Sequence, residues 1–312
     1  MQRFLVYILC ACSALFWGVT FNVGKITVGY IPPLTTAALR IVIAGIFMLG
    51  VVALTEKDTL AMLKRNLRMY VVLGLVGVVG FNALFFIGLR FTSPLNGALI
   101  MATNPLVTAL LAGLIFHQSI NRTHKIGTTI SFVGVVIVLC GGSLHRLITL
   151  NFSIGDLLII LADICLALYG VLGRHYLKAS TPIMTTAIST TIAALVLPVV
   201  ALVVEPGTTL AGYPPVAWWS LAFMALLGSG LAYVFWNYGI REIGASNTSA
   251  FFHLVPVFTV LASLPLGQTV TALQIVGGII VVTGVTFATG VLHAPAPRRV
   301  ADAEPAVAGA KG

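Results

Sequence analysis

The chain has 312 residues, 59% of them hydrophobic and 8% charged, and its mean hydropathy is +1.06. A soluble domain carries about a quarter charged residues, and no soluble fold of this length could bury so much apolar surface. The net charge of +9 comes largely from basic residues in short connections between apolar runs, which favours membrane topology over nucleic-acid binding. The composition therefore predicts an all-α integral membrane protein in a lipid bilayer, with no nucleic acid as a partner.

Ten apolar runs are long enough to cross a bilayer, since about 20 apolar residues span roughly 30 Å of hydrocarbon. The runs lie at approximately 4–24, 33–54, 69–90, 94–116, 124–142, 154–174, 181–204, 216–239, 246–266 and 270–291. The dyad alternation of a membrane barrel is absent. The first run is long for a signal peptide and further spans follow at once, so we expect it to be retained. The sequence predicts ten transmembrane helices.

Basic residues gather on one side of these spans. If the N-terminus is cytoplasmic, the cytoplasmic set is Arg3, Lys57, Lys64, Arg65, Arg68, Arg122, Lys125, Arg174, Lys178, Arg241, Arg298, Arg299 and Lys311, and the opposite set is Lys25, Arg90 and Arg146. The positive-inside rule then places both termini in the cytoplasm. We expect a multi-pass protein of the bacterial inner (plasma) membrane, with a disordered cytoplasmic tail at 293–312.

The sequence contains an internal repeat. A shift of 151 residues places Gly77 on Gly228, Gly88 on Gly239, Arg90 on Arg241, Asn96 on Asn247, Pro105 on Pro256 and Thr108 on Thr259. Neighbouring shifts place Trp17-Gly18 on Tyr169-Gly170, and Thr35-Thr36-Ala37 on Thr185-Thr186-Ala187. Chance matching in apolar sequence is the alternative, but the coincidences follow the order of the spans. We expect two repeats of five helices, 1–147 and 152–292, the second inverted because five is odd. Such repeats place a binding site near the midplane and permit alternating access.

These segments resemble the EamA-type domains of the drug/metabolite transporter superfamily. The resemblance is carried by ALFWGVTFNVGK, by AALRIVIAGIFML, by the segments around Pro105 and Pro256, and by the glycines of spans 5 and 10. It covers residues 4–291 and implies a ten-helix transporter, most similar to amino acid exporters of the YddG type. Such domains commonly carry Leu-Gly-Glu at the end of the fourth span of each repeat. Here those places read Phe116-His117-Gln118 and Leu266-Gly267-Gln268, so that glutamate has no counterpart in this chain.

Aromatic and amide residues at matching positions predict a substrate-binding site. Tyr233, Trp236 and Asn237 follow i, i+3, i+4 spacing and share one helical face. A cavity for an amphipathic solute combines aromatic walls with a few placed polar groups. An interfacial aromatic belt is the alternative, although amides are penalised in hydrocarbon. The predicted substrate-binding residues are Trp17, Asn82, Tyr169, Tyr233, Trp236 and Asn237.

Three ionisable residues inside spans are candidates for coupling or gating: Asp163, His253 and Arg40. Arg40 either contacts substrate or a gate, or snorkels to the near interface. Asp163 must pair, accept hydrogen bonds or stay protonated, so it either holds helices together or carries a coupling proton. His253 is either a helix–helix contact or a proton relay. Arg40 and Asp156 lie at comparable depth on the outer side and Asp163 lies near the middle of its span, so we expect Arg40 to pair with either acid.

The pattern as a whole favours a secondary transporter that exports small amphipathic metabolites, amino acids including aromatic ones, by alternating access through a central cavity. A passive channel or uniporter for small solutes is the alternative. A membrane-embedded lipid-acting enzyme is disfavoured, because Asp163 and His253 stand isolated and no nucleotide or metal motif occurs. We therefore expect no enzyme activity and no cofactor. The expected partners are a small-molecule substrate and the lipid bilayer, and the expected state is a monomer or weak dimer.

Overall fold

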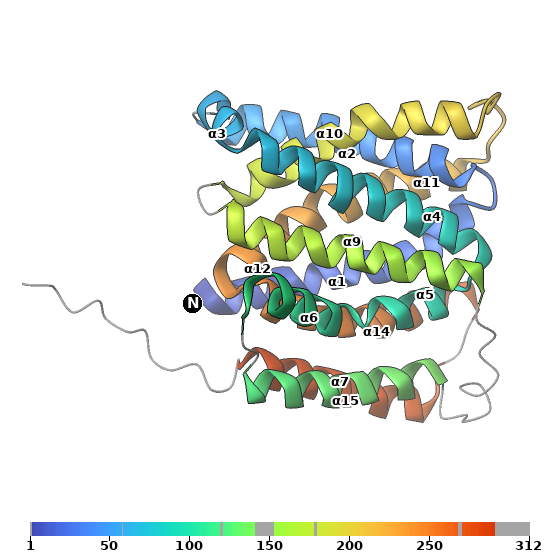
Figure 1. The fold of residues 1–312 in the computed structure, drawn as a ribbon. Coiled ribbons are helices and arrows are strands. Elements are labelled where there is room, and N and C mark those ends of the chain that lie inside the picture. Colours follow the sequence, from blue (N-terminus) through green and yellow to red (C-terminus); the bar gives the residue numbers. More distant parts are fainter. Residues whose placement is uncertain are drawn as a thin grey trace, which may run out of the picture.

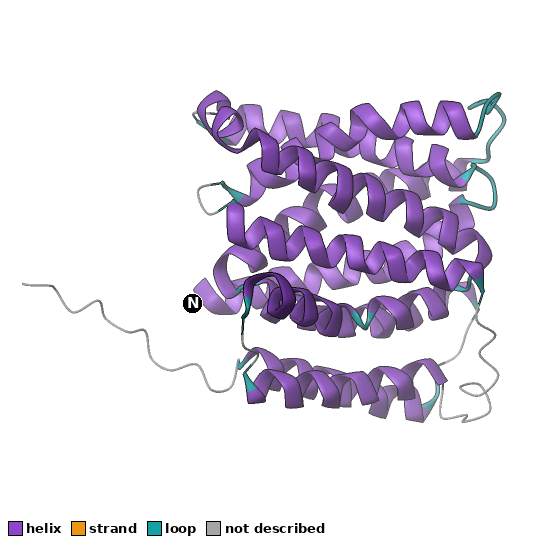
Figure 2. Ribbon diagram, viewed as in Figure 1, coloured by secondary structure: helices purple, strands orange, loops and turns teal. Residues whose placement is uncertain are grey.

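The computed structural model describes residues 2–57, 59–118, 121–140, 153–177, 180–267 and 270–290. Every regular element within these ranges is a helix (Figure 2). Ten helical stretches are long and apolar enough to cross a membrane. The predicted fold class, an all-α membrane protein with ten spans, is confirmed. The predicted boundary between repeats at 147–152 and the predicted tail at 293–312 lie outside the described residues.

The first half contains α1 (Gln2–Thr27), α2 (Pro33–Thr55), α3 (Thr59–Val72), the π-helix η1 (Leu73–Gly80), α4 (Phe81–Phe91), α5 (Pro94–Met101), α6 (Asn104–Phe116) and α7 (Arg122–Cys140). The second half contains α9 (Ile154–Tyr176), α10 (Pro182–Val204), α11 (Pro215–Phe223), the π-helix η2 (Met224–Leu231), α12 (Ala232–Ile243), α13 (Ala245–Ser249), η3 (Ala250–His253), α14 (Leu254–Leu261), η4 (Leu264–Leu266) and α15 (Ala272–Thr289). Proline occupies the first turn of α2, α5, α10 and α11, where its missing N–H costs no hydrogen bond.

The third span is longer than its apolar run. Helix is continuous from Thr59 to Phe91, so the polar residues of α3 extend the third span. Tyr70 is the buried side chain of α3, and its hydroxyl lies 2.7 Å from Ser180 Oγ, which holds this extension near the start of α10. A hydropathy scan averages the polar and apolar faces of a helix, so it does not detect the polar start of this span.

Helix pairing follows an approximate two-fold relation between the halves. The second helix of each half, α2 or α10, packs against its own counterpart, and so does the fifth, α7 or α15. The pair α4–α9 has α12–α1 as its counterpart, and both pairs form. Figure 1 shows α2 and α10 at one edge of the bundle, α7 and α15 at the opposite edge, and α1, α4 and α9 between them. This pairing is consistent with an inverted repeat.

The irregular helix segments also repeat. The π-helix η1 and its counterpart η2 are offset by the same 151 residues as Gly77 and Gly228. Span 4 is interrupted between α5 and α6, and span 9 between α13 and α14, where η3 lies. A π segment leaves some carbonyls without their usual partner and is frequent at functional sites. These distortions are thus part of the repeated plan.

Two glutamates tie α2 to α10 at opposite ends. Glu205, which follows α10, accepts hydrogen bonds from the backbone N–H of Leu34 and Thr35 at 2.9 and 2.8 Å, at the start of α2. Glu56, which follows α2, accepts one at 2.7 Å from Thr181, the N-cap of α10. A carboxylate at a helix N-terminus is stabilised by the free N–H groups and the helix dipole. The antiparallel pair is therefore fixed at both ends.

Candidate functional site

An aromatic cluster fills the centre of the bundle, where the two halves meet. Trp17 of α1 stacks on Phe252 with ring centroids 5.1 Å apart, and its edge contacts Trp236 at 4.9 Å and Tyr233 at 5.7 Å. Tyr169 of α9 meets Tyr233 edge to face at 6.0 Å. All five side chains are at least 93% buried within the protein. The cluster therefore joins α1, α9 and α12, elements from both halves, with η3, and it is not an interfacial belt.

Asn237 links the cluster to α10. Its amide Nδ2 donates to the Tyr169 hydroxyl at 2.8 Å and to Thr186 Oγ1 at 2.9 Å. Asn237 also lines a pocket at the adjoining end of the bundle. Because its amide is held by two side chains, its orientation toward that pocket is fixed.

The two halves place an aromatic ring on equivalent glycines. Trp17 Nε1 donates to the carbonyl of Gly228 at 2.9 Å, within η2. Its counterpart Tyr169 lies on Gly77 of η1, where an added Cβ would come within 2.4 Å of the Tyr169 ring. A side chain at Gly77 would displace the Tyr169 ring or the helix, whereas one at Gly228 would press on Thr20 and Arg40. The glycine spacing noticed in the sequence thus serves the close approach of aromatic side chains.

Arg40 lies beside this cluster and is 1% exposed. Its Nε donates to Ser229 Oγ at 2.5 Å, and its Cζ lies 5.3 Å from the centre of the Phe86 ring. Arg40 makes no ion pair within the described residues. The expected pairing with Asp156 or Asp163 is wrong: both acids are engaged with neutral side chains on other elements.

Asp163 binds the interruption in span 4. Its Oδ1 accepts from Asn104 Nδ2 at 2.6 Å, and its Oδ2 accepts from Thr103 Oγ1 at 3.2 Å. Asp156 belongs to a capping box at the start of α9 and accepts from Thr92 Oγ1 at 2.5 Å. Both acids thus attach α9 to the preceding half.

His253 lies away from the cluster in its contacts. Its Nδ1 is 2.5 Å from Ser131 Oγ of α7, and its ring lies 6.5 Å from the Phe132 ring. The side chain is 1% exposed. Through these contacts, His253 connects span 9 to α7, the helix that packs on α15.

Nη1 of Arg40 and two further polar atoms at the centre make no geometrically good hydrogen bond within the described part of the chain. The two are the hydroxyl of Tyr233 and Oδ1 of Asn82. Asn82 uses its Nδ2 to donate to the Val78 carbonyl at 2.8 Å, and the Tyr233 hydroxyl lies near both Asn82 and Arg40. Tyr233 and Asn82 still interact with each other outside good hydrogen-bond geometry, so the clearest unpaired group at the centre is Nη1 of Arg40, and a buried unpaired polar group costs roughly 1–3 kcal/mol.

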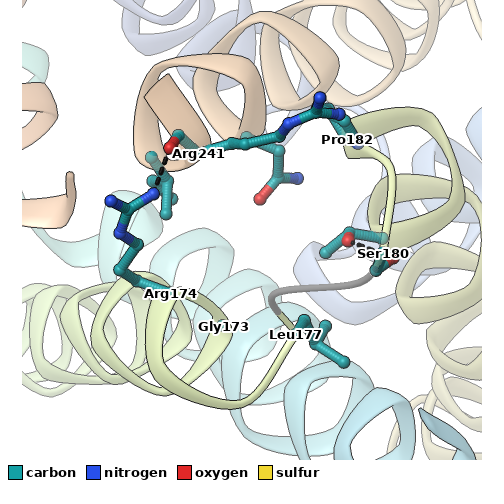
Figure 3. Close-up of a pocket in the computed structure, with 9 residues that line it drawn as sticks. Gly173, Arg174, Leu177, Ser180, Pro182 and Arg241 are labelled. Carbon is teal, nitrogen blue, oxygen red and sulfur yellow. Dashed lines mark hydrogen bonds between the residues drawn. The ribbon is translucent and has the colours of Figure 1, made fainter. Parts of the chain in front are cut away.

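The open space differs from the expected central cavity. The centre holds only a void of about 20 Å³, lined by Arg40 and Trp17 with the aromatic residues Phe21, Phe81, Phe85 and Phe252 among its walls. The larger pocket, about 260 Å³, lies at one end between α9, α10 and α12, and of the six predicted residues only Asn237 lines it (Figure 3). In this structure the six do not line one cavity, because the central rings pack on one another, and their role in binding substrate stays a prediction. The structure does bring the six into one neighbourhood.

Comparisons with known proteins agree with this architecture. The model of the EamA-like transporter family matches residues 4–140 and again residues 153–290. The chain belongs to the EamA-like transporter family. It is 43% identical over 295 residues to a Bacillus subtilis (strain 168) protein named uncharacterized transporter YyaM, covering 95% of this chain and 97% of that one. It is 26% identical to an uncharacterized transporter of Methanothermobacter thermautotrophicus, covering 91% and 86% of the two chains.

A solved structure shares the fold of this EamA-like protein. A crystal structure with 18% sequence identity superposes with a TM-score of 0.74, covering 92% of this chain and 96% of the other. The likeness shows that the ten-helix arrangement is common to proteins of very different sequence.

The missing Leu-Gly-Glu segments leave the backbone turn in place. Helix α6 ends at His117, which adopts the left-handed conformation with φ 52°, and η4 ends at Gly267 with φ 84°. Gln268, which stands where other EamA-like domains have the acid, lies outside the described residues. The turn therefore does not depend on the glutamate.

Sequence reasoning missed two polar contacts of the centre, Ser229 and Thr186, and one aromatic contact, the ring of Phe252. Ser229 lies between Gly228 and Gly230, and a hydroxyl between two small residues was a usable signal. Thr186 was noticed only as part of a repeat match. No metal-binding group of three or more His, Cys, Asp or Glu occurs among the described residues.

Proposed function

We propose that this EamA-like protein is a secondary transporter that exports small amphipathic metabolites, including aromatic amino acids, by alternating access between its two halves. The observation that carries the proposal is the closed aromatic centre beside an open pocket at one end of the bundle. Asn237 connects the two, since it lines the pocket and holds Tyr169. Aromatic walls with a few fixed polar groups suit such solutes. The narrower choice of amino acids rests on the resemblance to amino acid exporters.

The closed centre also favours a carrier over a passive channel. A channel needs a continuous passage, whereas the central void of about 20 Å³ is smaller than any metabolite. Substrate entry would require the rings around Trp17 to separate. In folds of inverted repeats, rocking of one half against the other supplies such a motion.

For orientation, we place the pocket end in the cytoplasm of a bacterial cell, with both termini on that side of the inner membrane. Arg174 and Arg241 line the pocket, and the N-terminal end of α1 lies at the same side of the bundle as α3 (Figure 1). Positive charge gathers on cytoplasmic connections. Export then begins with substrate entering this pocket.

The test is flux through the purified protein in liposomes, measured with labelled amino acids in a counterflow assay. We expect counterflow of phenylalanine or tryptophan by the native protein, and a loss of about tenfold or more in Trp236→Ala, because hot-spot aromatic contacts are worth about 2 kcal/mol or more. Trp219→Ala is the matched control, since Trp219 is 77% exposed and outside the centre. If Trp236→Ala and Trp219→Ala gave equal flux and equal yields of folded protein, the central cluster would not be the substrate site.

A further inference from the structure

The guanidinium of Arg40 is the most unusual group in the described part of the chain. It carries five donors and a permanent charge, yet within the described residues it makes one side-chain hydrogen bond, to Ser229, and lies over the face of Phe86. Its Nη1 has no hydrogen-bond partner among the described residues. A buried charge without a counter-ion is strongly unfavourable, so such a group is expected to meet an anion at some stage.

The described acids are all committed elsewhere. Glu56 and Glu205 cap α10 and α2, Asp156 caps α9, Asp163 binds Asn104 and Thr103, and Glu242 lies 3.4 Å from Arg241. The remaining three acids of the sequence, at 58, 302 and 304, lie outside the described residues. The protein core therefore supplies Arg40 with no carboxylate of its own.

Arg40 packs tightly on the side of η2, which requires a glycine there. A Cβ placed on Gly228 would lie 3.4 Å from Arg40 Nη2 and 3.0 Å from Thr20 Oγ1. Arg40 also lines the central void, opposite Trp17 and Phe252. A guanidinium edge at an apolar, aromatic-walled void is suited to a planar anionic group attached to an apolar body.

The second half lacks this cation. The repeat counterpart of Arg40 is Thr190, from the shift that aligns Thr36 with Thr186, and the counterpart of Ser229 is Val78. Both counterparts are buried. The two-fold plan therefore does not explain the presence of Arg40, whereas an asymmetric ligand would.

We propose that Arg40 binds the carboxylate of the transported substrate, which makes this protein a carrier of small aromatic or aliphatic carboxylates. The inference rests on the proposed transport function and narrows its substrate class. Nη1 and Nη2 present the fork that pairs with both carboxylate oxygens. Ser229 holds the fork by Nε, and the Tyr233 hydroxyl, which interacts with Asn82 and Arg40, offers a polar contact for a group on the neighbouring carbon. One cation matches a carboxylate better than a phosphate dianion.

The test compares four probes with a common phenylethyl group: L-phenylalanine and 3-phenylpropionate carry a carboxylate, whereas L-phenylalaninamide and phenethylamine do not. In liposome flux, we expect the native protein to favour the two carboxylates. Arg40→Gln should slow the carboxylates by about tenfold or more and leave the other two nearly unchanged, because truncating one partner of a buried charge pair removes that much binding. Arg40→Lys, which keeps the charge without the fork, should fall between them.

A second variant and a second readout separate this inference from the transport proposal. Ser229→Ala keeps the charge, and we expect it to raise KM for 3-phenylpropionate several-fold with little change in kcat. In detergent, 3-phenylpropionate should raise the melting temperature of the native protein and not that of Arg40→Gln, since ligands stabilise the state that binds them. Stabilisation without flux of any probe would leave the site standing and remove the transport proposal for these compounds. Two outcomes would overturn the carboxylate site. One is equal phenylalanine flux in the native protein and in Arg40→Gln, and the other is the absence of both flux and stabilisation.

Discussion

The two ends of the bundle are built from equivalent helices but are closed in different ways. At one end, called the clamp end, Lys25 of α1 donates to the carbonyls of Leu89, Arg90 and Thr92, at 2.8, 3.1 and 2.7 Å, where α4 finishes. Asp156 adds its bond to Thr92 from the start of α9. Three helices are thus held together by charged groups on backbone and side chain.

At the pocket end, the equivalent helices meet more loosely. Arg174 of α9 donates to the carbonyl of Arg241 near the end of α12, as Lys25 does for Arg90 (Figure 3). Arg174 and Arg241 are exposed, and the pocket of about 260 Å³ opens beside them. The counterpart of Asp156 is an apolar residue of α1, so the second tie is missing.

The comparison teaches that the backbone repeat and the side chains have separate roles. The repeat supplies two ends of the same design, each with a cation at the C-terminus of a neighbouring helix, where the dipole favours it. The side chains decide which end is closed. For alternating access, the balance between two such ends must be small enough for a ligand to reverse.

The largest expected effect comes from backbone contact at the clamp end. In Gly155→Ala, the new Cβ would lie 2.5 Å from the Gly88 carbonyl oxygen and 2.8 Å from the Thr92 nitrogen, both backbone atoms that have little room to move. We expect a loss of about 1–3 kcal/mol in the free energy of unfolding, as in other overpacked cores. Thermal melting of the purified protein in detergent measures it.

Two control variants sharpen this prediction. Gly239→Ala at the pocket end meets side chains, Cys10 and Thr248, and should cost less than Gly155→Ala because side chains can shift. Gly50→Ala meets nothing within 4 Å and should be neutral or slightly stabilising. Equal melting temperatures for all three variants would show that the clamp end is no tighter than the pocket end.

An intermediate effect is expected from the clamp itself. Lys25→Met removes three charge-assisted hydrogen bonds while keeping an apolar stem. If the closed clamp end loses about 1–2 kcal/mol of stability, the population of molecules open at that end should rise roughly five- to thirty-fold. Met101→Cys, in a background without the four native cysteines, reports the opening, because Met101 is 1% exposed and lines the central void. Labelling by an impermeant maleimide added outside the cell should become faster.

The matched control is Arg174→Met at the pocket end, which should not accelerate labelling of Met101→Cys from outside. Faster labelling in this control than in Lys25→Met would show that the pocket end faces the outside of the cell, opposite to the orientation we propose. Unchanged labelling in both would mean that neither cation contributes to closure.

The sequence was sufficient for the helices and for the neighbourhood of the site, and insufficient for its contacts. Span length and repeat spacing depend on local composition, so the sequence alone could predict the ten spans and the shared face of Tyr233, Trp236 and Asn237. The partner of Arg40 depends on which helices are neighbours, so Ser229 replaced the expected acids. The interruption after Met101 also depends on packing, since Asp163 binds the freed turn through Thr103.

The smallest effect is expected at Asp163, whose repeat counterpart in α1 is Ala11 under the shift that aligns Trp17 with Tyr169. The second half thus carries a carboxylate, bound to Asn104 of α6 at 2.6 Å, where the first half has a methyl group. Asp163→Asn replaces one acceptor by a donor and should cost about 1 kcal/mol of stability, the net value of one hydrogen bond. Transport driven by an imposed pH gradient should stay within about twofold of the native rate, because a group that binds the same partners throughout cannot shift the balance between states. Loss of gradient-driven accumulation with exchange intact would instead make Asp163 the proton site, and the two halves would then differ in chemistry as well as in closure.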